Sequence, residues 1–175
     1  MIYSKSDAEI LSQQEGKPTS RPVLPGTANV TSDMLWDRLE PWLEYRWGER
    51  NVVWVIRGLG LWGPSLRPTT IDNAEVWCAW GRSWQPVELV PGPIGYEING
   101  MTYRITATVG DTDAPPDIVL EAARRLAGYL DQAGADPAQG HTSGTDGDYS
   151  FTRPAGWAAR AIHLSGAADL LRTFR

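Results

Sequence analysis

Few side chains in this sequence have the type and spacing that nucleophilic or acid–base catalysis requires. Ser143 and Ser165 each precede a glycine, but neither lies in a G-x-S-x-G elbow, the turn that exposes a serine nucleophile. His141 falls in a stretch rich in turn formers and His163 lies beside an apolar patch, so surface and structural roles are favoured for both. Cys78 is in the middle of an expected strand, where a small buried side chain is favoured. The sequence therefore indicates no nucleophile and no general base.

Metal and nucleotide chemistry are also poorly supplied. Asp136, Asp146 and Asp148 are spaced too irregularly to be the ordered oxygen ligands of a calcium loop. The chain has 1 cysteine and 2 histidines, which leaves few ligands for a Cys/His metal site. Gly58-x-Gly60 is too short for a dinucleotide fingerprint and follows no strand–helix junction. We therefore expect no cofactor and a protein that is not an enzyme.

Length and charge restrict the class of protein further. A chain of 175 residues is long enough for one domain with tails and a core of its own. Its formal net charge of -5 argues against a surface that binds nucleic acid by neutralising phosphates. No apolar run approaches the roughly 20 residues that cross a bilayer, and the first residues carry no apolar signal region. We expect a soluble protein, made in the cytoplasm, that does not contact a membrane.

The strongest helical signal lies in residues 114–134, where two prolines precede a long amphipathic stretch. Glu121 and Arg125 are four residues apart on its polar side, which predicts an ion pair, and Gly134 supplies a stop. The apolar positions expected to face the core recur at helical spacing: Ile118, Ala122, Leu126, Leu130 and Ala133. Val119 and Ala123 widen the stripe that they form. The rest of the fold is expected to assemble around this helix.

A second amphipathic helix is expected after the N-cap candidates at residues 31–33. Its apolar positions run from Leu35 to Trp47, and Gly48 ends it. Pro41 leaves two alternatives, a kink in one helix or a separate helix with the proline in its first turn. This helix is the natural packing partner of the first.

Between the two helices the hydrophobic period changes to two, which predicts an antiparallel meander over residues 51–109. Residues 58–68 are expected to form a loop. Asn99-Gly100 predicts a two-residue hairpin turn, because both residues accept positive φ. In the returning strand, one face is expected to be buried and the threonine-rich face wet. The buried positions are Met101, Tyr103, Ile105, Ala107 and Val109.

The two ends of the chain are expected to be arms. Residues 1–30 have no sustained period, although a short helix over residues 6–14 is compatible with the sequence. An unstructured terminus and an arm that becomes ordered only against a partner remain alternatives. Residues 135–175 read as a mobile linker over 135–147, an extended segment at 148–153 and a short helix over 154–162. A final short helix covers 167–175. The predicted fold class is therefore α+β, with two long core helices in residues 31–134 flanking the β insertion and extended N-terminal and C-terminal arms.

Tryptophan is over-represented, with 9 tryptophans against 2 phenylalanines. Large core or interface residues are one interpretation. A carbohydrate-binding β module is the other, and it would use exposed rings such as Trp62, Trp77, Trp80 and Trp84. Stacking rings would have to share one wet face, whereas these positions alternate between faces and loops.

Four blocks of sequence together resemble the head–tail adaptor (connector) proteins of long-tailed bacteriophages and gene transfer agents. They are EYRWGERNVVWVIRGLG, W-x-PVELVPGP, YRITATVGDTDAPPDIVLEAARRLAGYL and GWAARAIHLSGAADLLRTFR. In that family a β-rich insertion separates two core helices. A proline segment, here residues 114–117, opens the second helix, and the chain closes on Leu-Leu-x-x-aromatic-Arg. The resemblance covers about residues 31–175 and rests on the order of the blocks, while the first thirty residues depart from the family pattern.

The resemblance implies a structural virion protein in the neck between capsid and tail. Such a protein forms a homo-oligomeric ring, with twelve subunits as the expected number, between the portal and the stopper or tail-terminator protein. The genomic DNA passes through its lumen without specific binding. The C-terminal arm of relatives reaches the portal, which implies portal contacts for Leu170, Leu171, Arg172, Phe174 and Arg175. The alternative is that this apolar and cationic segment folds back onto its own core.

Overall fold

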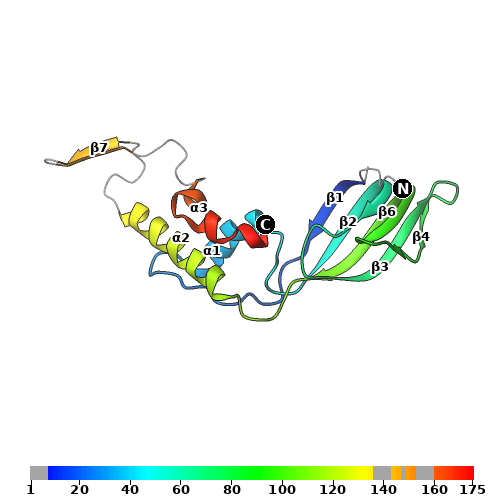
Figure 1. Ribbon diagram of the computed structural model, residues 1–175, viewed down its shortest axis with the longest axis horizontal. Helices are drawn as coiled ribbons and strands as arrows, with labels where there is room; N and C mark the ends of the chain where they lie inside the picture. Colours follow the sequence, from blue (N-terminus) through cyan, green and yellow to red (C-terminus); the bar gives the residue numbers. More distant parts are fainter. Residues whose placement is uncertain (1–7, 136–142, 147–148, 153–159) are drawn as a thin grey trace. The chain divides into compact units, whose positions relative to one another are not determined.

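The computed structural model describes residues 8–135, 143–146, 149–152 and 160–175. The chain divides into two compact units (Figure 1). The sheet unit comprises Met1–Arg21 and Tyr45–Asp113, and the helical unit comprises Pro22–Glu44 and Ala114–Arg175. In the described ranges the fold is mixed α+β, with an antiparallel sheet of six strands, a separate two-stranded sheet and a single long helix.

The sheet has the strand order β1-β2-β6-β3-β4, and β5 pairs with β6 off this path. The strands are β1 (Glu9–Glu15), β2 (Arg50–Trp62), β3 (Thr69–Cys78), β4 (Ser83–Pro86), β5 (Val90–Pro91) and β6 (Tyr96–Val109). All its pairs are antiparallel, but the order is not that of a meander, because β6 lies between β2 and β3. The long β6 pairs with β2 on one side and with β3 on the other. The last strand of the β insertion therefore lies at the centre of the sheet.

One face of the sheet carries the core of this unit. The alternation predicted for the first strand is confirmed, since Val52, Trp54 and Ile56 are fully buried. From β6 the core receives Tyr103, Ile105, Ala107 and Val109, as predicted. Met101 was expected in this row but is 43% exposed, because the strand bulges just before it.

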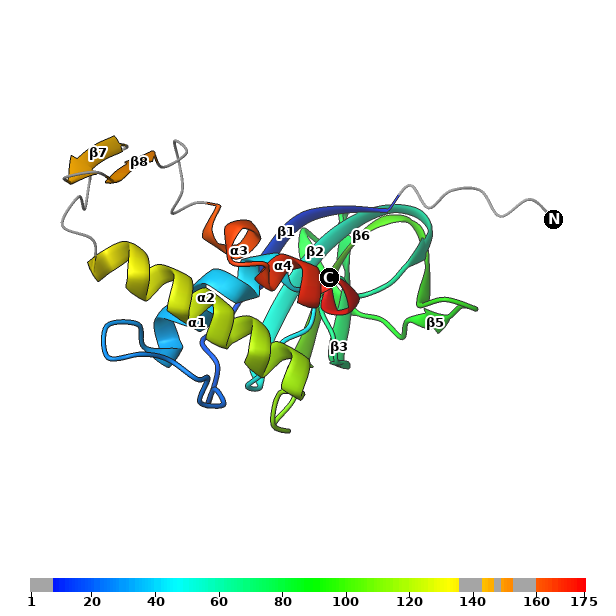
Figure 2. The ribbon, with the colours of Figure 1, turned by 60° about the vertical axis from the view of Figure 1, so that its left-hand side comes forward.

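The predicted hairpin turn at Asn99-Gly100 is wrong. β6 continues through these residues and pairs with β2 on both sides of them. β2 itself extends to Trp62, into the first part of the segment expected to be a loop. The register shifts between Arg57 and Leu59, and Gly58 and Gly100 have φ values of 142° and 85°. Glycine here serves a bulge rather than a turn. Figure 2 shows the two long strands curving together.

The N-terminal segment forms an edge strand, so both alternatives considered for residues 1–30 are corrected where the structure describes them. β1 pairs with β2 from Glu9↔Arg57 to Glu15↔Val52. The Gln13 side chain also accepts a hydrogen bond from the indole Nε1 of Trp54 at 2.9 Å. Pairing with β2 overrides the weak helical tendency of this stretch.

The helical unit contains one long helix instead of two. α1 (Ser32–Leu39) has eight residues and is followed by the 3₁₀ turn η1 (Glu40–Trp42), which has Pro41 in its first positions. The backbone is extended at Leu43, so the helix expected to reach Trp47 ends early. Proline lacks the N–H that a longer helix would need at this point. Thr31 is the N-cap, as predicted, and its side chain accepts a hydrogen bond from Met34 N.

The long helix α2 (Asp117–Ala135) confirms the strongest prediction, and its buried face packs on α1. The buried side chains of the helix are Val119, Ala122, Ala123, Leu126 and Ala127. Leu126 therefore lies where it was expected, Leu130 is half-buried, and Ile118 is 40% exposed. Val119 and Ala123, predicted to widen the apolar stripe, are both buried, whereas Ile118 does not belong to the buried face.

Three short elements follow along the chain. β7 (Ser143–Asp146) pairs with β8 (Tyr149–Thr152) as a hairpin, which confirms extended structure for part of 148–153 and corrects part of the expected linker. The remaining linker residues and 153–159, most of the helix predicted for 154–162, lie outside the described residues. The chain closes with α3 (Ala161–Leu164), α4 (Ala167–Leu170) and η2 (Arg172–Phe174).

Candidate docking site

The C-terminal segment is divided at Gly166, between the two short helices predicted for it, and again within the second of them. Gly166 precedes α4 with a φ of 75°, a left-handed conformation that reverses the chain after α3. The helix expected over 167–175 then changes at Leu171 into η2. The result is a short, compact cap of three turns that packs along α2.

Burial shows which way this segment faces. Leu171 is fully buried, as are Ala161 and Ala167. The carbonyl of Phe174 accepts a hydrogen bond from Glu44 N at 3.0 Å, which ties the last turn to the end of η1. The segment is therefore folded onto its own unit, the alternative to a free arm. Leu171 belongs to the core of the helical unit and is not an exposed contact.

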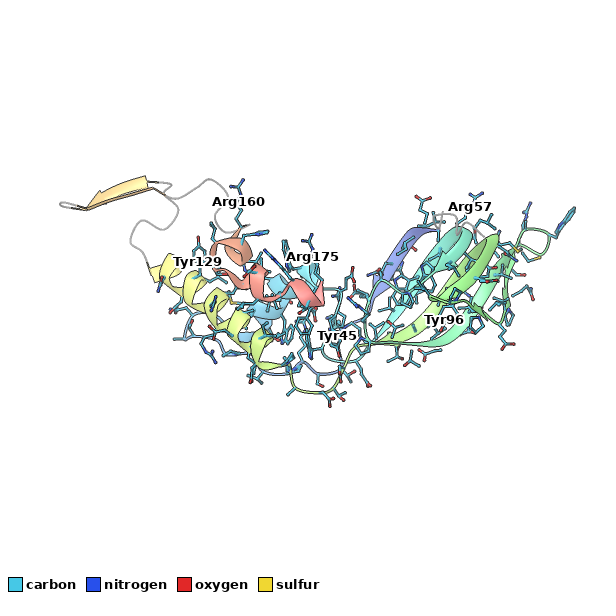
Figure 3. All side chains as sticks on the ribbon, viewed as in Figure 1. Tyr45, Arg57, Tyr96, Tyr129, Arg160 and Arg175 are labelled. Carbon is cyan, nitrogen blue, oxygen red and sulfur yellow. The ribbon has the colours of Figure 1, made fainter. Side chains whose placement is uncertain are left out.

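The remaining residues assigned to docking are more accessible. Leu170 and Phe174 are half-buried, while Arg172 and Arg175 are exposed. Figure 3 shows Arg175 at the end of the segment and Arg160 at its beginning. The two arginines of the predicted arm, Arg172 and Arg175, thus lie on the surface, whereas Leu171 is buried.

These cations lie at a pocket of about 330 Å³ on the helical unit. The pocket is lined by Trp42, His163, Gly166, Ala168, Asp169, Arg172 and Arg175. Trp42 comes from η1, whereas the other residues come from the C-terminal segment. The fold brings together residues that are far apart in the sequence.

Trp42 is at the centre of this pocket. The edge of the His163 ring meets it at 4.6 Å between centroids and an interplanar angle of 89°. The Arg175 guanidinium carbon lies 4.5 Å from the centre of the Trp42 ring, in cation–π contact. The indole Nε1 of Trp42 is buried and has no hydrogen-bond partner among the described residues. An unsatisfied buried donor costs free energy.

The charge of the pocket favours an anionic group. Asp169 pairs with Arg172 at 3.0 Å, which leaves the charge of Arg175 uncompensated within the lining. The exposed guanidinium groups and the imidazole provide donors in excess of acceptors among the side chains of the lining. A carboxylate of a partner would accept from several of them at once.

The predicted ion pair on α2 is confirmed. Arg125 Nε donates to Glu121 Oε1 at 3.0 Å, and Arg124 donates to the other carboxylate oxygen. Hydrogen bonds from Arg125, and then from Arg124, hold the pKa of Glu121 below its ordinary value. All three side chains lie at the surface, so this cluster stabilises the helix weakly and makes no pocket.

No family model, curated protein or solved structure matches this chain. Within the described ranges, no group of three His, Cys, Asp or Glu side chains is arranged to hold a metal ion. No helix in the described part of the chain is long and apolar enough to cross a bilayer. The site therefore has to be interpreted from its own chemistry.

Sequence reasoning identified the two arginines of the pocket but not its aromatic half. Trp42 was read as part of an apolar helix face and His163 as a structural residue. The sequence signal for this site is the composition of residues 160–175, which contain one aspartate and three arginines beside a short apolar run. It does not reveal the partner of that segment, because Trp42 lies more than a hundred residues earlier.

Proposed function

We propose that this chain is a structural virion protein, a head–tail adaptor that assembles as a ring, with twelve subunits as the expected number. It lies in the neck between the portal and the stopper or tail-terminator protein, and genomic DNA passes through the lumen without specific binding. Its role is mechanical rather than catalytic, and it is made in the host cytoplasm.

The observation that carries the proposal is the Trp42–His163–Arg175 pocket on the C-terminal segment, the segment that the sequence resemblance assigns to the portal. Aromatic and arginine side chains dominate the energetics of protein interfaces. Here an exposed arginine, a tryptophan with an unused N–H and a histidine share one concave surface. Docking accordingly uses a preformed cationic pocket rather than insertion of Leu171.

A pull-down with the portal protein of the same virus tests this assignment. The variant Arg172→Glu/Arg175→Glu reverses both exposed charges of the pocket and should abolish capture of the portal. Arg160→Glu is the matched control, because Arg160 is an exposed arginine of the same unit that does not line the pocket. Equal capture by the two variants would refute the docking role of the pocket.

Assembly requires a separate measurement. Mass photometry of the purified protein and electron microscopy of virion necks should both show a closed ring. A chain that remains monomeric alone and in the presence of the portal would refute the adaptor assignment, whatever the pocket binds.

A further inference from the structure

The face of the sheet opposite the core forms a shallow trough. A depression of about 490 Å³ crosses this face, within the size range of ligand pockets. Its lining comes from five neighbouring strands and consists of Ser12, Gln14, Val53, Val55, Glu75, Trp84, Arg104 and Thr106. We use "trough" for these eight residues.

The register explains how they meet on one face. Ser12 is opposite Val55, which is opposite Arg104, which is opposite Glu75. Residues directly opposite each other in antiparallel strands share a face. A second row joins Gln14, Val53 and Thr106 in the same way. The trough therefore runs across the strands, over four strand spacings or about 19 Å.

One end of the trough is aromatic and held rigidly. The Trp84 ring meets Trp77 at 5.3 Å between centroids and an angle of 64°. The Arg104 guanidinium carbon lies 4.7 Å from the centre of the Trp84 ring, and the same arginine pairs with Glu75 at 2.6 Å. Trp84 is thus fixed in place by neighbours on two strands before any ligand arrives.

The rest of the trough is polar, but it has no net charge. The single cation and the single anion of the lining pair with each other. Ser12, Gln14 and Thr106 offer hydroxyl and amide groups, and the two valines give a neutral floor. Nucleic acid would require uncompensated cations along the face. An extended peptide would instead add to the edge of a sheet through its backbone.

We propose that the trough is a binding site for a neutral linear oligosaccharide. Such a ligand carries hydroxyls that both donate and accept, and C–H faces that pack on an indole ring. It needs no counter-charge and is long enough to cross several strands. Arg104 covers one face of the Trp84 ring, so the part of the ring that remains open to the trough supplies the packing surface, and the polar row ending at Gln14 orients the hydroxyls. This site is independent of the docking pocket, which belongs to the other unit.

The structure also shows which of the tryptophans considered for carbohydrate binding lie where a sugar could contact them. Trp62 is 4% exposed and belongs to the core, so it is excluded as a stacking ring. Trp80 is 100% exposed but does not line the trough. Trp84 therefore carries the site, with Trp77 supporting it from the opposite strand.

Isothermal titration of the full chain with chitohexaose, cellohexaose and maltohexaose tests the proposal. We expect saturable binding of at least one of these neutral hexasaccharides, unaffected by added salt. Trp84→Ala should weaken binding by about tenfold or more, a change of about 1.4 kcal/mol. Gln14→Ala, an exposed edge-strand change with little effect on folding, should also weaken it. Trp80→Ala is the matched control and should leave the affinity unchanged.

Three results would overturn the proposal: none of the three sugars binds, Trp84→Ala and Trp80→Ala behave alike, or a thymidine oligonucleotide binds the trough with strong salt dependence. Far-UV circular dichroism and urea midpoints establish that each variant is folded. None of these variants touches the docking pocket, so loss of sugar binding with intact portal capture separates the two proposals.

Discussion

The Glu15 carboxylate accepts hydrogen bonds from Nε and Nη2 of Arg46, at 3.0 and 3.1 Å, across 31 positions of the sequence. Arg50 Nη1 lies 3.7 Å from the same carboxylate. Both arginines are almost fully buried, at 6% and 5% exposure, whereas Glu15 is at the end of an edge strand whose residues are all exposed. The N-terminal strand is therefore fastened to the sheet unit by its last side chain.

Replacing Glu15 should destabilise the sheet unit more than its exposure suggests. Glu15→Gln removes the charge that compensates two buried guanidinium groups, so we expect a loss of about 2 kcal/mol in the free energy of unfolding. Glu9→Gln is the control, since Glu9 lies exposed at the other end of the same strand. Urea unfolding followed by tryptophan fluorescence measures both variants, and coincident midpoints would contradict the fastening role.

The same contact should depend on pH. Burial opposes ionisation of Glu15, but hydrogen bonds and charge from Arg46, with help from Gln13 and Arg50, hold the pKa of Glu15 below its ordinary value. A carboxyl with a lowered pKa in the folded state stabilises fully above its unfolded pKa of about 4.3, and this contribution is lost as pH falls through the folded value. The difference in unfolding free energy between the wild type and Glu15→Gln should therefore be constant near neutral pH and shrink in acid. A difference that shrinks instead as pH rises would contradict this assignment.

The orientation of the C-terminal segment can be tested by a core truncation. Leu171→Ala should destabilise the helical unit by about 3 kcal/mol, because it leaves a cavity where a fully buried side chain packed. Leu164→Ala removes the same atoms from a side chain that is 45% exposed and should change stability by less than about 1 kcal/mol. Thermal unfolding of the two variants measures the difference. Equal stability of the two variants would indicate that Leu171 lies at the surface and that the C-terminal segment is a free arm.

Gly95, just before β6, and Gly100, within β6, should differ sharply in the stability that is lost when each is replaced by alanine. Gly95 and Gly100 have nearly the same φ, 84° and 85°. A Cβ at Gly100 meets nothing within 4 Å, so Gly100→Ala should cost only the backbone strain of about 1–2 kcal/mol. A Cβ at Gly95 would lie 2.3 Å from the carbonyl oxygen of Trp62, so Gly95→Ala should cost clearly more. Urea midpoints that rank the two variants in the opposite order would contradict the pairing of β2 with β6.

The sequence predicts best what depends on neighbouring residues. The alternation of Val52, Trp54 and Ile56 and the helical spacing over 114–134 are local patterns, and both elements formed as expected. Asn99-Gly100 is equally local but misleads, because β6 pairs with β2 both before and after these residues, and this pairing outweighs the turn preference. A propensity decides the structure only where no long-range pairing competes with it.

Only part of the candidate site could be predicted from the sequence. The exposed arginines follow from the composition of the closing segment, and the Glu121–Arg125 pair follows from its spacing. The inward position of Leu171 and the meeting of Trp42 with His163 are set by how α3, α4 and η1 pack, which no local period encodes. The trough likewise depends on the register of five strands. The sequence shows which residues alternate within a strand, but it does not show the order in which the strands pair.

The two parts of the helical unit are separated in the chain by the larger part of the sheet unit, Tyr45–Asp113, and this has a consequence for synthesis. On the ribosome, α1 emerges early and must wait with Leu35, Trp36 and Leu39 uncovered until α2 has been translated. The strands of the sheet unit are all present by Asp113 and can pair in that interval. A nascent chain should therefore complete its β framework first, and chaperones should bind it most strongly at α1 during the delay.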